Sequence, residues 1–361
     1  MTRPTNYNRV HQAHLTQYQK KVAALYAEAV REVARLGVAV DFDPDGIFAF
    51  ADYPMTTERM RRITDSLAEG LEAVIVNGVN SEWTLANNKN SELARRVFGD
   101  NVGRLTQAQY RRYFSSNDDA REAFLQRKVQ GLDLSERVWR YTDQFKAEIE
   151  LGLDIGLRSG LDAASMARQL QQFLQHPDML FRRVRDEHGM LHLSQRAAAY
   201  HPGQGVYRSS YRNARRLTVT ETNMAYHSAD YERWQQLDFV VGIEIRLSGN
   251  HTCLGRDGKA HDFHDICDDL QGRYPKDFKF VGWHPHCRCQ AITILKTEKE
   301  LMQENQTLLD GKKPTTDSVN RVDDVPDNFK QWLDDNENRI AHAKSVPYFL
   351  RDNPKYTDTE Q

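Results

Sequence analysis

The first 175 residues carry apolar side chains at the spacing of amphipathic helices. Between positions 5 and 37 apolar residues recur at steps of three and four, and charged residues take the other side. A second stripe runs to Asn77-Gly78, a pair typical of a helix end. The asparagine-rich segment 87–90 then indicates a break before the next helix.

Shorter helical stripes continue from 105 to 175. Ser135 and Asp162 each precede such a stripe, and residues of these types favour the N-cap position. The sequence therefore predicts a mainly α-helical region over residues 1–175, suited to contact with a partner protein.

The pattern changes after this region. Residues 176–205 contain many helix breakers and are expected to form a linker, and a strong helical stripe follows at about 206–237. Three later segments are short, apolar and β-branched or aromatic, which favours strands. They are 239–247, 278–281 and 290–295. We expect an α+β fold, in which residues 206–295 form a small module whose few-stranded sheet carries a loop rich in cysteine and histidine.

Residues 296–361 form a polar tail. From Glu300 to Gln361 there are 13 acidic and 8 basic residues, a net charge of −5. One amphipathic helix is expected over 326–343, and such a helix after a polar linker is typical of a docking element.

Composition narrows the class of protein. The 361 residues include 49 basic and 51 acidic side chains, so the overall charge does not indicate a nucleic-acid partner. No run of about 18 apolar residues is present, and no apolar signal-peptide core follows the polar N-terminus. We expect no membrane association and a reducing compartment.

All four cysteines lie between positions 253 and 289. His284 and Cys287 are three residues apart and can reach one metal from a tight turn, while Cys253 and Cys267 can supply two more ligands. Cys289 is the alternate ligand. The spacing leaves two interpretations open, a structural zinc site and a metal-free loop with buried thiols.

A third interpretation is a metal-dependent nuclease or toxin-like effector. His261, Asp262, His264 and Asp265 lie inside the same segment, and a nuclease would use His261, His264 or His284 with the acids Asp262 and Asp265. No second catalytic set is visible in the sequence, so we expect no enzyme and no catalytic residue.

Other polar residues are candidates for structural or binding roles. Glu221 falls on the apolar stripe of the 206–237 helix and needs a partner there, for which an ion pair is favoured. Arginine clusters are candidates for contact with DNA phosphates, although solvated helix faces have the same appearance. They are Arg59, Arg61 and Arg62, then Arg182, Arg183 and Arg185, and then Arg212, Arg215 and Arg216.

The order of these motifs resembles the C-terminal half of phage head morphogenesis proteins of the Mu F-like minor head family. The motifs are Thr220-Glu221 on a helix, a cysteine-bearing loop, and the closing run from His284 to Cys289, which reads HPHCRC. Similarity is greater to the versions found in prophages of Bacteroides-type bacteria. It covers residues 130–353, including the run at 201–211 and the Pro347-Tyr348-Phe349-Leu350 stretch.

Two positions depart from the family pattern. Val219 stands where many members have an arginine, and Arg256 follows Cys253 where many have a second, nearby cysteine. The resemblance implies a structural role: a minor head component at the portal vertex, acting in head morphogenesis and in DNA packaging or delivery. It implies Thr220 and Glu221 as structural residues and the portal protein as partner, with major capsid protein, scaffolding protein and DNA as further candidates. The expected location is the virion, and the bacterial host cytoplasm during assembly.

Overall fold

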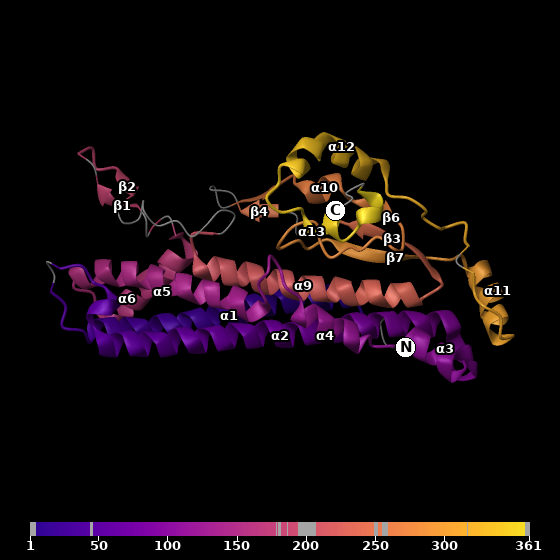
Figure 1. The fold of residues 1–361 in the computed structure, drawn as a ribbon, viewed down its shortest axis with the longest axis horizontal. Helices are drawn as coiled ribbons and strands as arrows, with labels where there is room; N and C mark the ends of the chain where they lie inside the picture. Colours follow the sequence, from indigo (N-terminus) through magenta and orange to yellow (C-terminus); the bar gives the residue numbers. More distant parts are fainter. Residues whose placement is uncertain are drawn as a thin grey trace. The chain divides into compact units, whose positions relative to one another are not determined.

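Long helices dominate the N-terminal half of the chain (Figure 1). A computed structural model describes residues 5–43, 46–177, 179, 182–185, 187–193, 207–248, 252–254, 259–315 and 317–357. The helices before position 176 are α1 (Tyr7–Val38), α2 (Pro54–Phe98), α3 (Gln107–Phe114), α4 (Asp118–Gln126), α5 (Leu134–Arg158) and α6 (Ala163–Gln175). Short 3₁₀ turns lie at Phe50–Asp52 and Gly99–Arg104. The predicted helical region is thus confirmed.

Helix α2 is continuous, so the helix end predicted at Asn77-Gly78 and the break predicted at 87–90 are both wrong. The asparagine side chains form their hydrogen bonds inside the fold and not in a turn. Asn87 Nδ2 donates to the carbonyl oxygens of Trp83 and Ser116, each at 3.0 Å. Asn90 Nδ2 donates to Asp230 at 2.7 Å. Tertiary hydrogen bonds override the local preference of asparagine for turns.

Of the two predicted N-caps, one is confirmed and one is wrong. Asp162 caps α6 as predicted, because its Oδ1 accepts from the backbone N–H groups of Ala164 and Ser165. Ser135 does not cap α5. Asp133 does, through a capping box in which the backbone N–H of Asp133 donates to Glu136 Oε2.

After the helical half the chain forms a small antiparallel sheet, which confirms the α+β class. The predicted helix 206–237 is α9 (Ser210–Gln236), and two predicted strands are β3 (Val240–Arg246) and β7 (Gln290–Leu295). The third strand is β6 (Gly272–Tyr274), not 278–281. The strand order is β6-β3-β7, with Ile243 of β3 opposite both Tyr274 and Thr293.

Residues 278–281 supply core side chains instead of a strand. Phe278, Phe280 and Val281 are at most 1% exposed. Trp283 lies among these aromatics, 5.1 Å from the ring of Phe280. Their apolar character therefore reflects burial in an irregular segment. A short apolar run in a sequence does not distinguish such a segment from a buried strand.

Two further strand pairs and one short helix are described in this part of the chain. Within the predicted linker, β1 (Arg182–Arg185) pairs with β2 (Leu191–Leu193), and residues 194–206 lie outside the described residues. In the cysteine segment, β4 (Thr252–Leu254) pairs with β5 (Ala260–Asp262), and α10 (Ile266–Asp269) follows.

The polar tail packs into the core of the sheet region. It contains α11 (Glu298–Leu309), α12 (Asp327–Ala341), α13 (Tyr348–Arg351) and a 3₁₀ turn at Pro354–Tyr356. Helix α12 confirms the predicted tail helix. Phe329, Phe349 and Leu350 are at most 1% exposed and belong to the same core cluster as Trp234 and Trp283. The tail is therefore an integral layer of this core.

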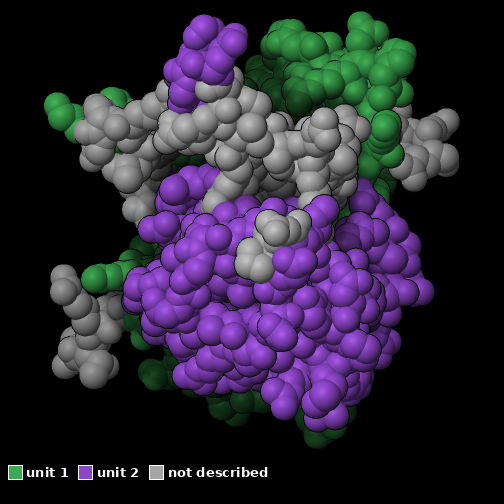
Figure 2. Space-filling model, turned by 90° about the vertical axis from the view of Figure 1, so that its left-hand side faces the viewer, with its two compact units in different colours: residues 1–14, 79–124, 220–361 green, residues 15–78, 125–219 purple. Residues whose placement is uncertain are grey.

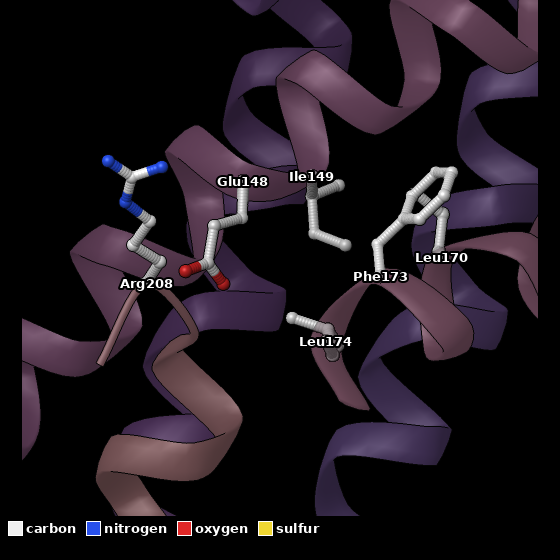
Figure 3. A pocket seen from close by; sticks show the side chains of 6 residues that line it. All are labelled: Glu148, Ile149, Leu170, Phe173, Leu174 and Arg208. Atoms are coloured by element: carbon white, nitrogen blue, oxygen red, sulfur yellow. The ribbon is translucent and has the colours of Figure 1, made fainter. Parts of the chain in front are cut away.

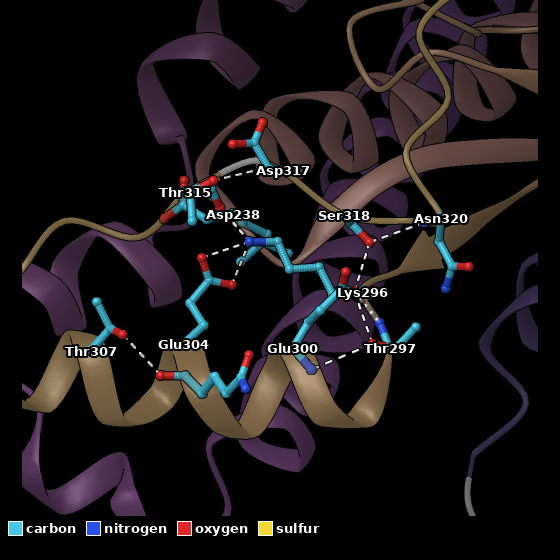
Figure 4. A network of polar contacts seen from close by, with 12 residues as sticks. Asp238, Lys296, Thr297, Glu300, Glu304, Thr307, Thr315, Asp317, Ser318 and Asn320 are labelled. Atoms are coloured by element: carbon cyan, nitrogen blue, oxygen red, sulfur yellow. Dashed lines mark hydrogen bonds and ion pairs between the residues drawn. The ribbon is translucent and has the colours of Figure 1, made fainter.

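A lysine fastens the start of the tail (Figure 4). Lys296, which is 4% exposed, donates from Nζ to Glu304 Oε1 at 2.6 Å and to the carbonyl oxygen of Thr315. Glu300 accepts hydrogen bonds from the backbone of Thr297 and Val319. These bonds tie α11 and the following loop to the end of β7.

The described residues form two compact units (Figure 2). Unit 1 comprises residues 1–14, 79–124 and 220–361, and unit 2 comprises residues 15–78 and 125–219. Each unit is discontinuous in sequence, and α1, α2 and α9 each contain a boundary between the two. The cysteine segment belongs to unit 1. Within the described residues, no helix has both the length and the apolar character needed to cross a membrane.

Candidate metal centre

Three buried cysteines meet in unit 1. Cys267, Cys287 and Cys289 are 3%, 2% and 3% exposed, and their sulfur atoms all lie within 4.8 Å of one another. Cys267 Sγ and Cys287 Sγ are 3.8 Å apart. Three thiols this close and this buried could hold a metal ion.

Helix α10 positions Cys267. Asp265 caps this short helix, and its Oδ1 accepts a hydrogen bond from the backbone N–H of Cys267 at 2.7 Å. The backbone N–H of Asp265 donates to Asp268 Oδ2, which completes a capping box. The cysteine is thus fixed at the first turn of a helix, with its sulfur directed into the core.

A tight turn positions Cys287. The backbone N–H of Cys287 donates to the carbonyl oxygen of His284 at 3.0 Å, and His286 adopts φ +72° between them. Thr220 on α9 secures the turn, because its Oγ1 accepts from the backbone N–H of His286 at 3.1 Å. Gly282, with φ +116°, precedes the turn, and a Cβ there would lie 3.2 Å from Cys287 Cβ.

His284 directs its Nε2 atom towards Cys267. Its Nδ1 lies 2.8 Å from the carbonyl oxygen of Pro285, which can only accept, so Nδ1 donates this hydrogen bond. Nε2 lies 3.1 Å from Cys267 Sγ and 3.4 Å from Asp265 Oδ2. A backbone carbonyl on Nδ1 is the usual support of a histidine that binds metal through Nε2.

Three electron-rich atoms therefore face one another at this edge of the cluster. The ligand atoms of Asp265, Cys267 and His284 lie within 4.8 Å of one another. Lone pairs on sulfur, nitrogen and oxygen repel unless a proton or a cation lies between them. Cys267 is common to this set and to the three-cysteine set, so a cation bound by its sulfur would serve both.

Hydrogen bonds among the thiols shift their pKa values in opposite directions. Hydrogen bonds from Cys267 and Cys289 hold the pKa of Cys287 well below its usual range. The hydrogen bond to Cys287 raises the pKa of Cys267. The thiolate is the form of cysteine that binds a cation.

The sulfur spacing fits a tetrahedral ion. Zinc–sulfur bonds of about 2.3 Å at tetrahedral angles place two sulfurs about 3.8 Å apart. The distance between Cys267 Sγ and Cys287 Sγ is 3.8 Å. Sulfur-rich donor sets of this kind favour zinc over magnesium or calcium, which prefer oxygen.

Some of the predicted ligands lie close together in the structure, and one has a side chain outside the described residues. Cys267 lies with Cys287 and the alternate residue Cys289 in one set, and with His284 in a second set. Cys253 is in β4, opposite His261 of β5, and its side chain lies outside the described residues. Its part in the site stays a prediction.

The residues assigned to a nuclease do not all gather at the sulfur cluster. His261, Asp262 and His264 are exposed, and His264 Nε2 lies 3.4 Å from Asp269 Oδ1. Asp265 and His284 are part of the ligand sets described above.

Most of the remaining predicted residues lie on α9 and β1. Glu221 is 3% exposed on α9, and its ion pair stays a prediction. Arg212 is exposed, whereas Arg215 donates to Gln19 Oε1. Arg216 is half-buried in the same helix. The side chains of Arg182, Arg183 and Arg185 in β1 lie outside the described residues.

Sequence reasoning missed a buried polar network behind the turn. His11 Nδ1 lies 2.6 Å from Glu82 Oε2, and His11 Nε2 lies 3.0 Å from Asn223 Oδ1. Asn223 in turn borders Gly282, since a Cβ there would lie 3.6 Å from Asn223 Nδ2. The signal was present in α1, where His11 occupies the apolar stripe. The network supports the backbone from which the cysteine turn begins.

Comparison of the chain with family models, curated proteins and solved structures gives no match in any of the three.

Proposed function

We propose that this protein is a minor head component of a phage, associated with the portal and acting in head assembly and DNA packaging or delivery. The observation that carries the proposal is the meeting of the motif residues in one place. Thr220 of the α9 motif binds the turn of the HPHCRC run, and that run supplies two of the three clustered cysteines. The residues that carry the family resemblance therefore form one structural unit.

We infer that the cluster is a structural zinc site with Cys267, Cys287, Cys289 and His284 as ligands. Structural zinc sites are closed by four protein ligands, whereas catalytic sites keep one position open to water. The three sulfurs are at most 3% exposed, which favours a closed site. In this role the metal ties α10 to the HPHCRC turn and supports an assembly part, not a reaction.

The portal association has a direct test. The chain carrying an affinity tag is co-expressed with the portal protein of its own prophage, and the complex is isolated by the tag and then by size-exclusion chromatography. We expect the two proteins to elute together and this chain to be present in purified procapsids. Separate elution, with the chain missing from particles, would refute the assembly role.

The zinc assignment is tested by metal content. Protein purified without chelator should hold about one zinc per chain, and Cys287→Ser should lose it and lower the melting temperature. Cys253→Ser is the matched control, because both changes remove one thiol from the same segment. A stoichiometric zinc that survives Cys287→Ser, or is lost in Cys253→Ser, would contradict the ligand set.

The competing nuclease has a separate readout. Plasmid DNA is incubated with the protein and added divalent metal, alongside His264→Ala. Metal-stimulated cleavage that is lost in the variant would replace the structural proposal with an enzymatic one.

A further inference from the structure

Positive charge is concentrated where α2 ends and α3 follows. Residues 95–112 hold five arginines, one aspartate and no lysine or glutamate, a net charge of +4. The whole chain has a net charge of −2, so the other residues together carry −6. A local excess of this sign is typical of a surface that meets a polyanion.

Helix ends explain only part of this excess. Arg95 lies in the last turn of α2, and Arg111 and Arg112 lie in the last turn of α3, where a cation interacts favourably with the helix dipole. Arg112 also stabilises the fold, because it pairs with Asp238 and donates to the carbonyl oxygen of Gln236. Arg95 and Arg111 are exposed, and within the described part of the chain neither forms an ion pair with a carboxylate.

An exposed aromatic ring lies beside these arginines. Tyr110 is 46% exposed, and its ring stacks on that of Phe114, with 4.6 Å between the ring centroids and 25° between the planes. Phe114 is half-buried and packs against the core that contains Trp234. The Arg95 guanidinium lies 5.5 Å from the Phe114 ring centroid. Side chains from α2 and α3 therefore meet around Phe114, and we call Arg95, Tyr110, Arg111 and Phe114 the aromatic–arginine patch.

The chemistry of the patch distinguishes between kinds of polyanion. The planar fork of arginine binds phosphate through two parallel hydrogen bonds, and an exposed ring offers a face on which a nucleobase can stack. In a duplex the bases are already stacked on one another, whereas the bases of a single strand are free to stack on a protein ring. An acidic protein segment would pair with the arginines and would leave the Tyr110 ring without a partner.

We propose that the aromatic–arginine patch binds single-stranded nucleic acid without regard to base sequence. One base stacks on Tyr110, and the neighbouring phosphates are bound by Arg95 and Arg111. Phe114 holds both the tyrosine ring and the Arg95 guanidinium in place, so the site is ordered before the strand arrives. This inference goes beyond the proposed function and does not depend on it.

The first test measures the affinity of the full chain for a fluorescent oligothymidylate of about 15 nucleotides by anisotropy. Tyr110→Ala removes the stacking face and should weaken binding by about 5- to 100-fold, which corresponds to about 1 to 3 kcal/mol per stacked base. Tyr110→Phe keeps the ring and should bind like the wild type. An oligouridylate of the same length distinguishes RNA from DNA. A duplex of the same length and polyglutamate should both bind more weakly.

The arginines are tested by the salt dependence of binding. Each phosphate contact with a single strand contributes about −0.7 to the slope of log affinity against log salt. Arg95→Gln combined with Arg111→Gln should therefore flatten the slope by about 1.4, so that the wild type loses about sevenfold more affinity than the variant over a fourfold rise in salt. The matched control is Arg273→Gln combined with Arg339→Gln, which removes equal charge from exposed positions elsewhere in unit 1.

Weaker binding by Tyr110→Ala and a flatter slope in the arginine variant support the patch, provided that the control binds normally and all variants melt like the wild type. Tyr110→Ala that binds like the wild type, an equal loss in the control, or tighter binding of the duplex or of polyglutamate overturns it. Portal co-elution is measured on the wild type as well. If it is seen while no oligonucleotide binds, the patch fails and the proposed function stands.

Discussion

Glu148 shows how one buried side chain can couple folding to pH. It is 3% exposed in unit 2 and accepts hydrogen bonds from Ser210 N at 2.9 Å, Ser210 Oγ at 2.6 Å and Gln144 Nε2 at 2.8 Å. Burial raises its pKa to about 8, against the opposing effect of these donors. Figure 3 shows Glu148 lining the same pocket as the apolar side chains of Ile149 and Leu174.

The raised pKa predicts the direction of a stability change. Between about pH 4.5 and pH 8 the folded chain keeps a proton on Glu148 that the unfolded chain has released, so stability falls as pH rises through this window. Glu148→Gln should remove this contribution, which amounts to about 2 to 3 kcal/mol between pH 5 and pH 7. Chemical denaturation at several pH values measures it. Glu32→Gln, an exposed change in the same unit, serves as control, and a pH profile that Glu148→Gln leaves unchanged would contradict the assignment.

At the level of elements, the sequence predicted which segments are helical better than it predicted where each helix ends. The stripes of α1, α6, α9 and α12 are long enough to identify the helix and its buried face. The ends depend on partners far away in sequence. Asn90 marks no break in α2 because Asp230 and Trp234, 140 and 144 positions later, bind its side chain.

The tail elements lead to a test of how the sheet region is stabilised. Phe329 of α12 lies 5.5 Å from Phe278 and 6.4 Å from Trp283, and Phe349 lies 5.3 Å from Trp283. Removing a buried phenylalanine costs about 3 to 5 kcal/mol, and a domain has about 5 to 15 kcal/mol in total. A chain ending at Val325 should therefore lose the near-ultraviolet circular dichroism of its packed tryptophans.

Point variants keep this prediction decisive if the truncated chain aggregates. Phe329→Ala should lower the free energy of unfolding by about 3 to 5 kcal/mol, whereas Met302→Ala, at a side chain that is 75% exposed, should leave it unchanged. A truncated chain that unfolds cooperatively with its tryptophans buried would show that the tail is dispensable.

At the level of the whole molecule, the site was partly predictable from sequence. Clustering of the cysteines and the three-residue step from His284 to Cys287 indicated a metal half-site, and both residues lie at the cluster. The place of Cys289 was not predictable, because an extended segment would separate it from Cys287. The turn after Gly282 and the capping of α10 by Asp265 bring the sulfurs together, and the turn depends on a tertiary contact from Thr220.

The interleaved units have a consequence for synthesis on the ribosome. Residues 5–14 belong to unit 1, yet that unit also needs Phe349 and Leu350 to fill its core. At 5 to 20 residues per second, roughly 20 to 70 seconds separate the emergence of His11 from that of Leu350. During that interval the nascent chain exposes aromatic surface, and its thiols have no completed pocket. Translation must finish this core before any metal can be enclosed in it.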